Sequence, residues 1–260
     1  MESKKKTSRH QPNSPRTRSL VDIATDSIGR QIVEFSYPPN TLLPTESEIA
    51  ASLGVGRNVV REATKILTSK GLLRITQGSG TKVQPEERWN YLDQQVINWA
   101  MESPNLRDGL IDELATLRFI VEPEVAALAA ERASTTEVLR LFEAYEEMEK
   151  HCDSPEKSVE ADILFHRRLF AAAHNKFLTA LLQTVVAVLR ANFLLAIKAD
   201  YAMVGFLEEH RLVAEAVNDK DPQRARSIMQ TLLENNKQHV IEMRQAIALK
   251  DRKRASAGGS

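Results

Sequence analysis

Three polar side chains close together in the sequence could read the base edges of DNA. Arg57 and Arg61 are four residues apart, so both face the same side of any helix that carries them. An arginine can bind guanine O6 and N7 with two hydrogen bonds, and Asn58 could do the same for adenine. On a lone surface helix such residues are more often solvated charge, so the neighbouring elements must decide between the two interpretations.

A second set of side chains could bind a metal ion or an acid. Asp162 and His166 are four residues apart and share one helix face, and His210 would add a second imidazole. This donor set suits a divalent transition metal such as zinc, nickel or manganese, and the alternative is a hydrogen-bonded polar pocket without metal. Arg118 and Arg190 lie among apolar neighbours, and an arginine facing the protein interior needs an anion, either an internal glutamate or a ligand carboxylate.

The elements around Arg57 form a helix-turn-helix pattern followed by a wing. Apolar spacing predicts helices over 19–35 and 57–69, with a second helix between them that begins after the N-cap Thr45 and ends at Gly54. Two short strands, 72–75 and 81–83, flank a tip of small residues at 77–80. The second helix of such a motif enters the major groove. Arg57, Asn58 and Arg61, on the second helix of the motif, are therefore predicted to bind DNA.

The rest of the chain is predicted to be helical, so the fold class is mainly α, a winged helix-turn-helix followed by an antiparallel helical bundle. A clear apolar stripe runs from Leu110 to Leu128. The further predicted helices cover 91–101, 135–150, 156–174, 177–198, 203–218 and 222–248. The predicted domains are a disordered basic arm (1–18), the DNA-binding domain (19–85), a linker with a connecting helix (86–104), an effector-binding and dimerisation domain (105–248) and a disordered tail (249–260).

Charge is unevenly distributed although the chain of 260 residues has a formal net charge of zero. Residues 1–85 carry 13 Lys and Arg against 7 Asp and Glu, and the remainder carries 22 against 28. A basic half suits a DNA-binding surface, but the arm alone carries most of the excess, so the charge only supports the motif. The single cysteine, Cys152, fits a reducing cytoplasm, and no run approaches the ~18–20 apolar residues of a membrane span.

The helix-turn-helix segment resembles the signature of the GntR family of regulators over Leu43 to Ala50, Leu53 to Arg57 and Val60 to Ala63. The strand segment from Gly78 to Val83 resembles the wing of that family. The resemblance implies DNA contacts at Arg57, Asn58, Arg61, Gln77 and Gly78. The DNA-binding surface expected from the motif and the resemblance together consists of Thr45, Glu46, Ser47, Arg57, Asn58, Arg61, Lys65, Gln77, Gly78, Ser79 and Gly80. One departure is Gly56, where the family usually has Ser or Thr, so a hydroxyl cap is predicted to be missing.

The region after the wing contains a series of residues and short motifs that together resemble a known domain. They are Glu113, Leu117-Arg118, Val121-Glu122-Pro123, Ala129 to Ala133, Asp162, Phe165-His166, His174-Asn175 and Glu209-His210. The region resembles the FCD effector domain of the FadR subfamily, and residues 89–93 are most similar to regulators of D-galactonate catabolism. The resemblance implies a carboxylate effector, a sugar acid, bound by Arg118, Arg190, Asp162, His166 and His210. Metal-binding relatives have a further histidine where this chain has Leu232, and His239 is a poor substitute.

We therefore expect a cytoplasmic, homodimeric DNA-binding regulator that leaves its operator when a small acid binds, with no membrane partner. The first alternative is a metal-dependent oxygenase or hydrolase that uses Asp162, His166 and His210. No cofactor fingerprint or nucleophile–base pair supports it. The second alternative is a structural nucleoid protein, which needs no large ligand domain.

Overall fold

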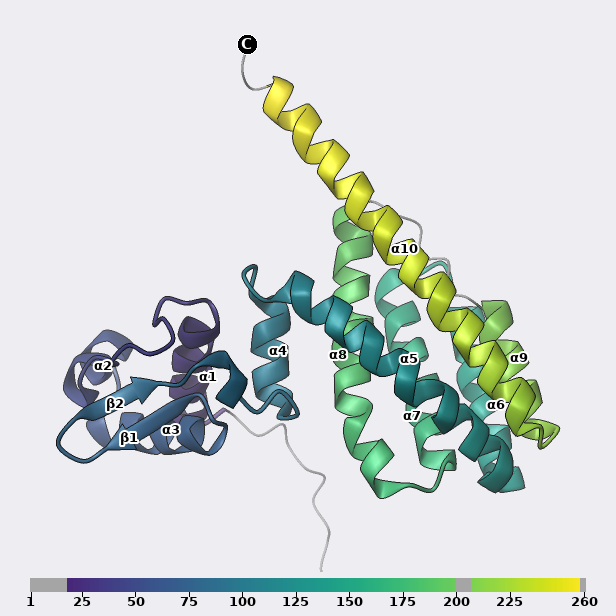
Figure 1. Ribbon diagram of the computed structural model, residues 1–260, viewed down its shortest axis with the longest axis horizontal. Helices are drawn as coiled ribbons and strands as arrows, with labels where there is room; N and C mark the ends of the chain where they lie inside the picture. The colour runs from purple at the N-terminus through teal and green to yellow at the C-terminus, as the bar shows by residue number, and fades with distance from the viewer. Residues whose placement is uncertain (1–17, 200–206, 258–260) are drawn as a thin grey trace, which may run out of the picture. The chain divides into compact units, whose positions relative to one another are not determined.

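The computed structural model describes residues 18–199 and 207–257, with side chains through residue 252. The chain folds as two compact units, Met1–Trp89 and Asn90–Ser260, each with its own core (Figure 1). The predicted basic arm lies outside the described residues apart from Arg18. The mainly α fold class is confirmed.

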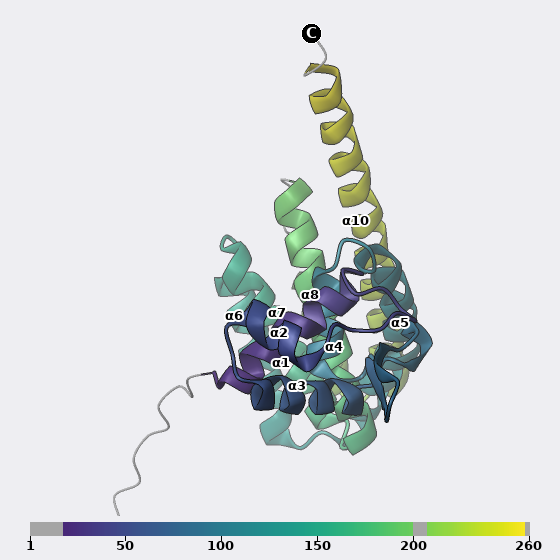
Figure 2. The same cartoon turned by 90° about the vertical axis from the view of Figure 1, so that its left-hand side faces the viewer.

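The first unit is a three-helix domain with a two-stranded wing. Helices α1 and α2 both pack on α3, as Figure 2 shows from the side of this unit. The core is closed by Ile28, Val60, Leu67 and Leu72, which have no exposed surface. The elements are α1 (Leu20–Val33), α2 (Glu46–Leu53), α3 (Arg57–Ser69), β1 (Leu73–Thr76), β2 (Gly80–Val83) and the short 3₁₀ helix η1 (Glu86–Arg88).

The ends of α2 and α3 follow the sequence signals. Thr45 caps α2 through a reciprocal capping box with Glu48, and Gly54 ends it with a left-handed φ of 65°. Gly56 precedes α3 without a side-chain cap, as expected from the departure at this position. The turn between the two helices is therefore short and fixed, which sets the direction of α3.

The end of the first unit is anchored by Trp89. Its indole is buried, and Nε1 donates a hydrogen bond to the Gln84 carbonyl at 3.0 Å. The predicted linker over 86–104 is wrong in this respect, because η1 and Trp89 belong to the first unit. Helix α4 (Gln94–Glu102) belongs to the second unit, where it packs on α5 and α8.

The second unit is a bundle of antiparallel helices. Its elements after α4 are α5 (Arg107–Arg132), α6 (Thr135–Lys150), α7 (Pro155–Ala172), α8 (Lys176–Ala199), α9 (Leu207–Asn218) and α10 (Pro222–Ala257). The first residues of the helix predicted over 203–218 lie outside the described part. The tail predicted from residue 249 is wrong, because α10 continues to Ala257 (Figure 1). The segment lacks an apolar stripe but consists mainly of strong helix formers, so the preceding helix propagates through it.

Helix α8 is the most apolar helix described. It has 24 residues, and the mean hydropathy of its most apolar 18-residue stretch is 1.9. By length and composition alone, the helix could cross a membrane. The expectation that no run approaches this limit is therefore wrong. About 61% of that window is buried inside the bundle, as expected for the core helix of a globular domain.

Two arginine–carboxylate pairs hold α5 against α10. Arg226 binds Glu124 with two nitrogen–oxygen contacts of 2.6 and 2.8 Å, and Arg244 lies 2.9 Å from Asp112. The pairs join opposite ends of the two helices, so α5 and α10 run antiparallel.

Candidate functional sites

The recognition surface of the first unit lies on α3. Arg57 and Asn58 are exposed in its first turn, and Arg61 follows one turn later on the same side. Val60, Ala63 and Leu67 face the opposite way into the core, so packing fixes which side of the helix is presented. The helix can therefore offer two arginines and one asparagine to base edges in the major groove.

Arg61 has an acidic partner on the neighbouring helix. The Glu46 carboxylate, in the first turn of α2, lies 3.3 Å from the Arg61 guanidinium, and both side chains are solvent-exposed. Thr45 and Ser47 flank it at the start of α2, and Lys65 pairs with Glu62 at 2.8 Å. Exposed pairs of this kind contribute little stability. Glu46 can therefore orient Arg61 and release it to DNA at small cost.

The wing tip is a tight loop of exposed residues. The loop consists of Gln77, Gly78 and Ser79 and joins β1 to β2, whose last paired residues are Thr76 and Gly80. Gly78 and Gly80 have φ values of 78° and 86°, a left-handed backbone conformation that residues other than glycine adopt only at a cost in free energy. A backbone without side chains at these points can approach a phosphate or the minor groove closely.

Strand register adds Arg74 as a candidate DNA contact, which sequence reasoning missed although it expected Lys82 to contact DNA. Arg74 lies directly opposite Lys82 in the antiparallel pair, and both are exposed. Like charges in this position repel each other, so the pair gains from a nearby anion such as a DNA phosphate. The signal was in the sequence but required the hairpin register to be known.

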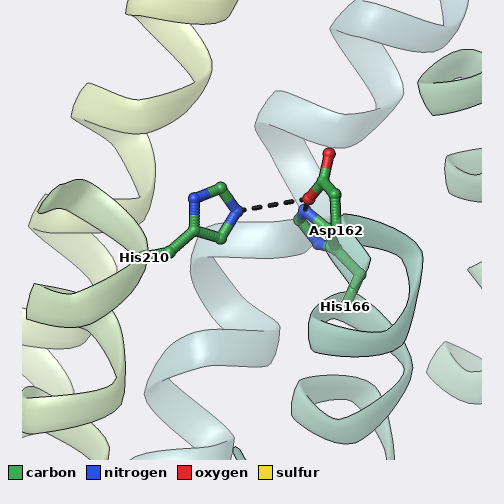
Figure 3. A group of neighbouring side chains, drawn as sticks. All are labelled: Asp162, His166 and His210. Carbon is green, nitrogen blue, oxygen red and sulfur yellow. Dashed lines mark ion pairs between the residues drawn. The ribbon is translucent and has the colours of Figure 1, made fainter. Parts of the chain in front are cut away.

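Asp162, His166 and His210 converge inside the second unit. The first two extend from α7 and the third from α9, with the carboxylate between the two imidazoles (Figure 3). Oδ1 of Asp162 lies 3.3 Å from Nε2 of each histidine, and one ligand atom from each residue falls within 4.8 Å of the others. Both histidines are buried. The predicted cluster therefore forms.

Two further charges complete this cluster. The Glu122 carboxylate, which is fully buried on α5, lies 2.9 Å from Nδ1 of His166 and also pairs with the Arg118 guanidinium one turn before it. Sequence reasoning quoted Glu122 within a motif but assigned it no role. The four-residue spacing of Arg118 and Glu122 was the signal that could have found it.

The protonation of the cluster follows from these contacts. Burial opposes charge on Glu122, Asp162 and His166, but the opposite charges around each of them outweigh it. Glu122 and Asp162 raise the pKa of His166 to about 9 against the effect of burial. Burial would raise the pKa of Glu122, yet Arg118 and His166 lower it to about 2. Against burial as well, the two imidazoles hold the pKa of Asp162 far below its ordinary value.

The cluster fits a metal ion with three protein ligands. Oδ1 of Asp162 and both ring nitrogens of His166 are buried and have no hydrogen bond of good geometry within the described residues, although Nδ1 lies 2.9 Å from the Glu122 carboxylate. The contact of Nδ1 with Glu122 is the arrangement by which proteins orient a metal-binding imidazole. Leu232 is buried in the apolar core, so it adds no fourth ligand. A metal here would keep open coordination positions for water or an anion.

The two predicted arginines differ in their surroundings. Arg118 is buried with 3% of its surface exposed and forms a salt bridge with Glu122. Arg190 does not face the interior as its apolar sequence neighbours suggested. Its side chain is 51% exposed and lies 2.9 Å from Glu160 at the surface, because the 100° step per residue turns it away from the buried face of α8. Arg190 is therefore removed from the cluster.

A helix-turn-helix with a wing and a separate helical domain with a buried polar site define a ligand-responsive DNA-binding regulator. Two family models match the chain: "Bacterial regulatory proteins, gntR family" over residues 21–83 and the FCD domain over residues 113–235. The chain belongs to the GntR family of transcriptional regulators and carries an FCD effector domain. It is not an enzyme, which excludes the oxygenase or hydrolase alternative.

Relatives match over most of the chain. The galactonate operon transcriptional repressor of Escherichia coli is 30% identical over 228 residues, which cover 87% of this chain and 99% of the relative. The Uxu operon transcriptional regulator of the same organism is 29% identical, over 81% of this chain and 82% of the relative. A solved structure titled for Lar of Listeria monocytogenes has a TM-score of 0.53 and 14% identity over 89% of this chain and 99% of that one, which shows a shared fold.

Proposed function

We propose that the protein is a homodimeric repressor of a sugar-acid catabolic operon, released from its operator by an acid of the galactonate type. The observation that carries this proposal is the buried Arg118 beside the polar cluster of Asp162, His166 and His210. Such groups suit a carboxylate effector with hydroxyl groups. Relatives named for galactonate and Uxu operons support the same class of ligand.

Three finer points belong to this proposal. Two chains related by a twofold axis double the base contacts of one winged domain and fix the half-site spacing. The cluster holds a divalent metal such as zinc, nickel or manganese, which offers an open position to an anion. The protein acts in the cytoplasm, where its operator lies.

The test of the proposal is operator release by a defined acid. Double-stranded operator is selected by the protein itself from a random pool, and its affinity is measured at fixed salt against aldonates, uronates and short dicarboxylates. One sugar acid is expected to lower operator affinity at least tenfold, which needs about 1.4 kcal/mol of differential binding. If only fatty acyl compounds or amino acids release DNA, the effector proposal fails.

A matched pair of variants locates the effector. Arg118→Lys keeps a positive charge beside Glu122 but removes the two-pronged guanidinium. It is expected to bind operator normally and to lose the response to acid. Arg190→Lys, at the exposed pair with Glu160, is expected to respond as the wild type does. An unchanged response in Arg118→Lys would place the effector elsewhere.

A further inference from the structure

A cavity of about 690 Å³ opens between α5, α8 and α10 of the second unit. Its volume falls within the roughly 300–1,000 Å³ typical of small-molecule sites. Its walls combine apolar side chains, among them Ile111, Phe119, Val188, Leu233 and Val240, with polar and charged ones, among them Asp112, Glu234, Lys237 and Arg244. Arg118 also lines it, and its guanidinium pairs with Glu122 one turn further along α5.

Two residues that line this cavity have a buried polar atom with no hydrogen bond within the described residues: Oδ1 of Asn192 and Nε of Arg244. Asn192 lies on the apolar helix α8 with 7% of its surface exposed. Its amide nitrogen donates to Oδ1 of Asn236 on α10 at 3.2 Å, and its own Oδ1 is buried without a hydrogen bond within the described residues. An unmet buried acceptor destabilises the fold, so a donor from a ligand or a water is expected there.

Arg118, which also lines this cavity, has N–H donors beyond those of its pair with Glu122. Its hydrogen bonds to Glu122 use Nε and Nη2. A guanidinium has five N–H donors, so it can keep Glu122 and still bind a second carboxylate. The cavity therefore presents one anion-binding edge and one buried acceptor for a hydroxyl.

We infer that this cavity binds a polyhydroxylated carboxylate, and that Asn192 determines its specificity by accepting a hydrogen bond from a ligand hydroxyl. The inference rests on the proposed function, from which it keeps Arg118 as the partner of the carboxylate, and it places a hydroxyl against Asn192. Asp162, His166 and His210 do not line this cavity, so the hydroxyl contacts come from α8 and α10. The carboxylate binds Arg118, and Asn236, which lies beside Asn192 on the neighbouring helix α10, is placed to contact a second hydroxyl. A plain alkyl acid of equal length leaves Asn192 Oδ1 unsatisfied, so it binds more weakly.

The test compares two acids of equal chain length on full-length protein by calorimetry. Galactonate carries the hydroxyls, and hexanoate carries none. Asn192→Leu is expected to weaken galactonate binding at least tenfold and to leave hexanoate binding unchanged. Asn192→Leu alone leaves the Asn236 amide without its hydrogen-bond partner, whereas the double variant with Asn192→Leu and Asn236→Leu removes both amides. The double variant is expected to show the same selective loss of galactonate binding. A stability defect of the single variant therefore does not decide the result.

Thr184→Val is the matched control. Thr184 is another buried polar residue of α8, but its hydroxyl donates to the Leu181 carbonyl at 2.6 Å and does not line the cavity. This variant is expected to bind galactonate as the wild type does. Wild-type affinity for galactonate in Asn192→Leu would mean that water satisfies Asn192, which overturns the inference while the proposed function stands. If wild-type protein binds and responds to no sugar acid, both fail.

Discussion

At the scale of single residues, the DNA contacts depend on a few side chains of α3. Arg57 is exposed in the first turn and has no structural role in the core. If it binds a guanine with two hydrogen bonds, Arg57→Ala lowers operator affinity by about 1–3 kcal/mol. Fluorescence anisotropy with labelled operator at matched salt measures the change.

Arg140→Ala provides the control, since Arg140 is an exposed arginine of the second unit. It is expected to leave operator affinity within error of the wild type. Equal affinity of Arg57→Ala and wild type would show that another face of α3 reads the DNA.

Sequence reasoning reached Asp162, His166 and His210 but not the charges around them. The spacing of Asp162 and His166 fixes one shared helix face, and similarity to relatives supplied His210 from α9. Glu122 and Asn192 depend on which face of α5 and α8 is buried and on which helices meet there, which is tertiary information. Arg190 shows the same limit, because its apolar neighbours in sequence do not determine which way it points.

At the scale of elements, the start of α6 predicts a dependence of stability on pH. Glu137 closes a capping box with Ser134, whose backbone and hydroxyl hydrogen bonds, with His174 nearby, lower the pKa of Glu137 from 4.5 to about 2. A lowered pKa in the folded state stabilises the protein above pH 4.5, and this contribution is lost as the pH falls from 4.5 towards 2. Glu137→Gln is therefore expected to be less stable than wild type at pH 7 and nearly equal to it at pH 2.

Urea unfolding at several pH values checks this expectation. Glu143→Gln serves as the control, because Glu143 is an exposed carboxylate on the same helix. The difference between wild type and Glu143→Gln is expected to stay small throughout. A Glu137→Gln difference that is constant with pH would mean that the charge contributes nothing to the cap.

The turn between α3 and the wing depends on Gly71. Its φ is 81°, and a Cβ added there would lie 2.1 Å from the Arg88 carbonyl oxygen. Gly54 also has a left-handed φ but has open space around it, so Gly54→Ala is expected to cost only about 1–2 kcal/mol. Gly71→Ala is expected to cost clearly more, because the chain near Trp89 must also move.

Trp89 fluorescence in a Trp99→Phe background reports unfolding of the first unit. Each glycine variant is compared with the same background. Equal losses of stability in Gly54→Ala and Gly71→Ala would show that the segment around Arg88 moves away from the added Cβ without cost. The left-handed φ of Gly71 would then be the whole reason for a glycine at this position.

Elements with strong local signals were predicted well, and their ends less so. The boundaries of α3 agree with the sequence because its apolar stripe, Val60 to Leu67, lies between Gly56 before the helix and Gly71 after it. The end of α10 was missed because the pattern of apolar residues ends about ten residues before the helix does. The membership of α4 in the second unit was also missed, because it is decided by packing on α5 and α8.

At the scale of the whole molecule, the dimer gives a direct prediction. Light scattering of the protein at micromolar concentration is expected to give the mass of two chains, alone and with a palindromic operator. A duplex with a single half-site is the control and is expected to bind more weakly, because it loses half of the base contacts. The mass of one chain in both measurements would contradict the proposed assembly.

The separate cores of the two units have a calorimetric consequence. Because each unit buries its own apolar side chains, heating is expected to give two unfolding transitions. An acid bound between α5, α8 and α10 stabilises only the second, by about 2.7 kcal/mol at a hundred times its dissociation constant. Operator DNA shifts only the first. A single scan with each ligand thus assigns it to a unit, and one transition that moves as a whole with either ligand would show that the two units unfold together.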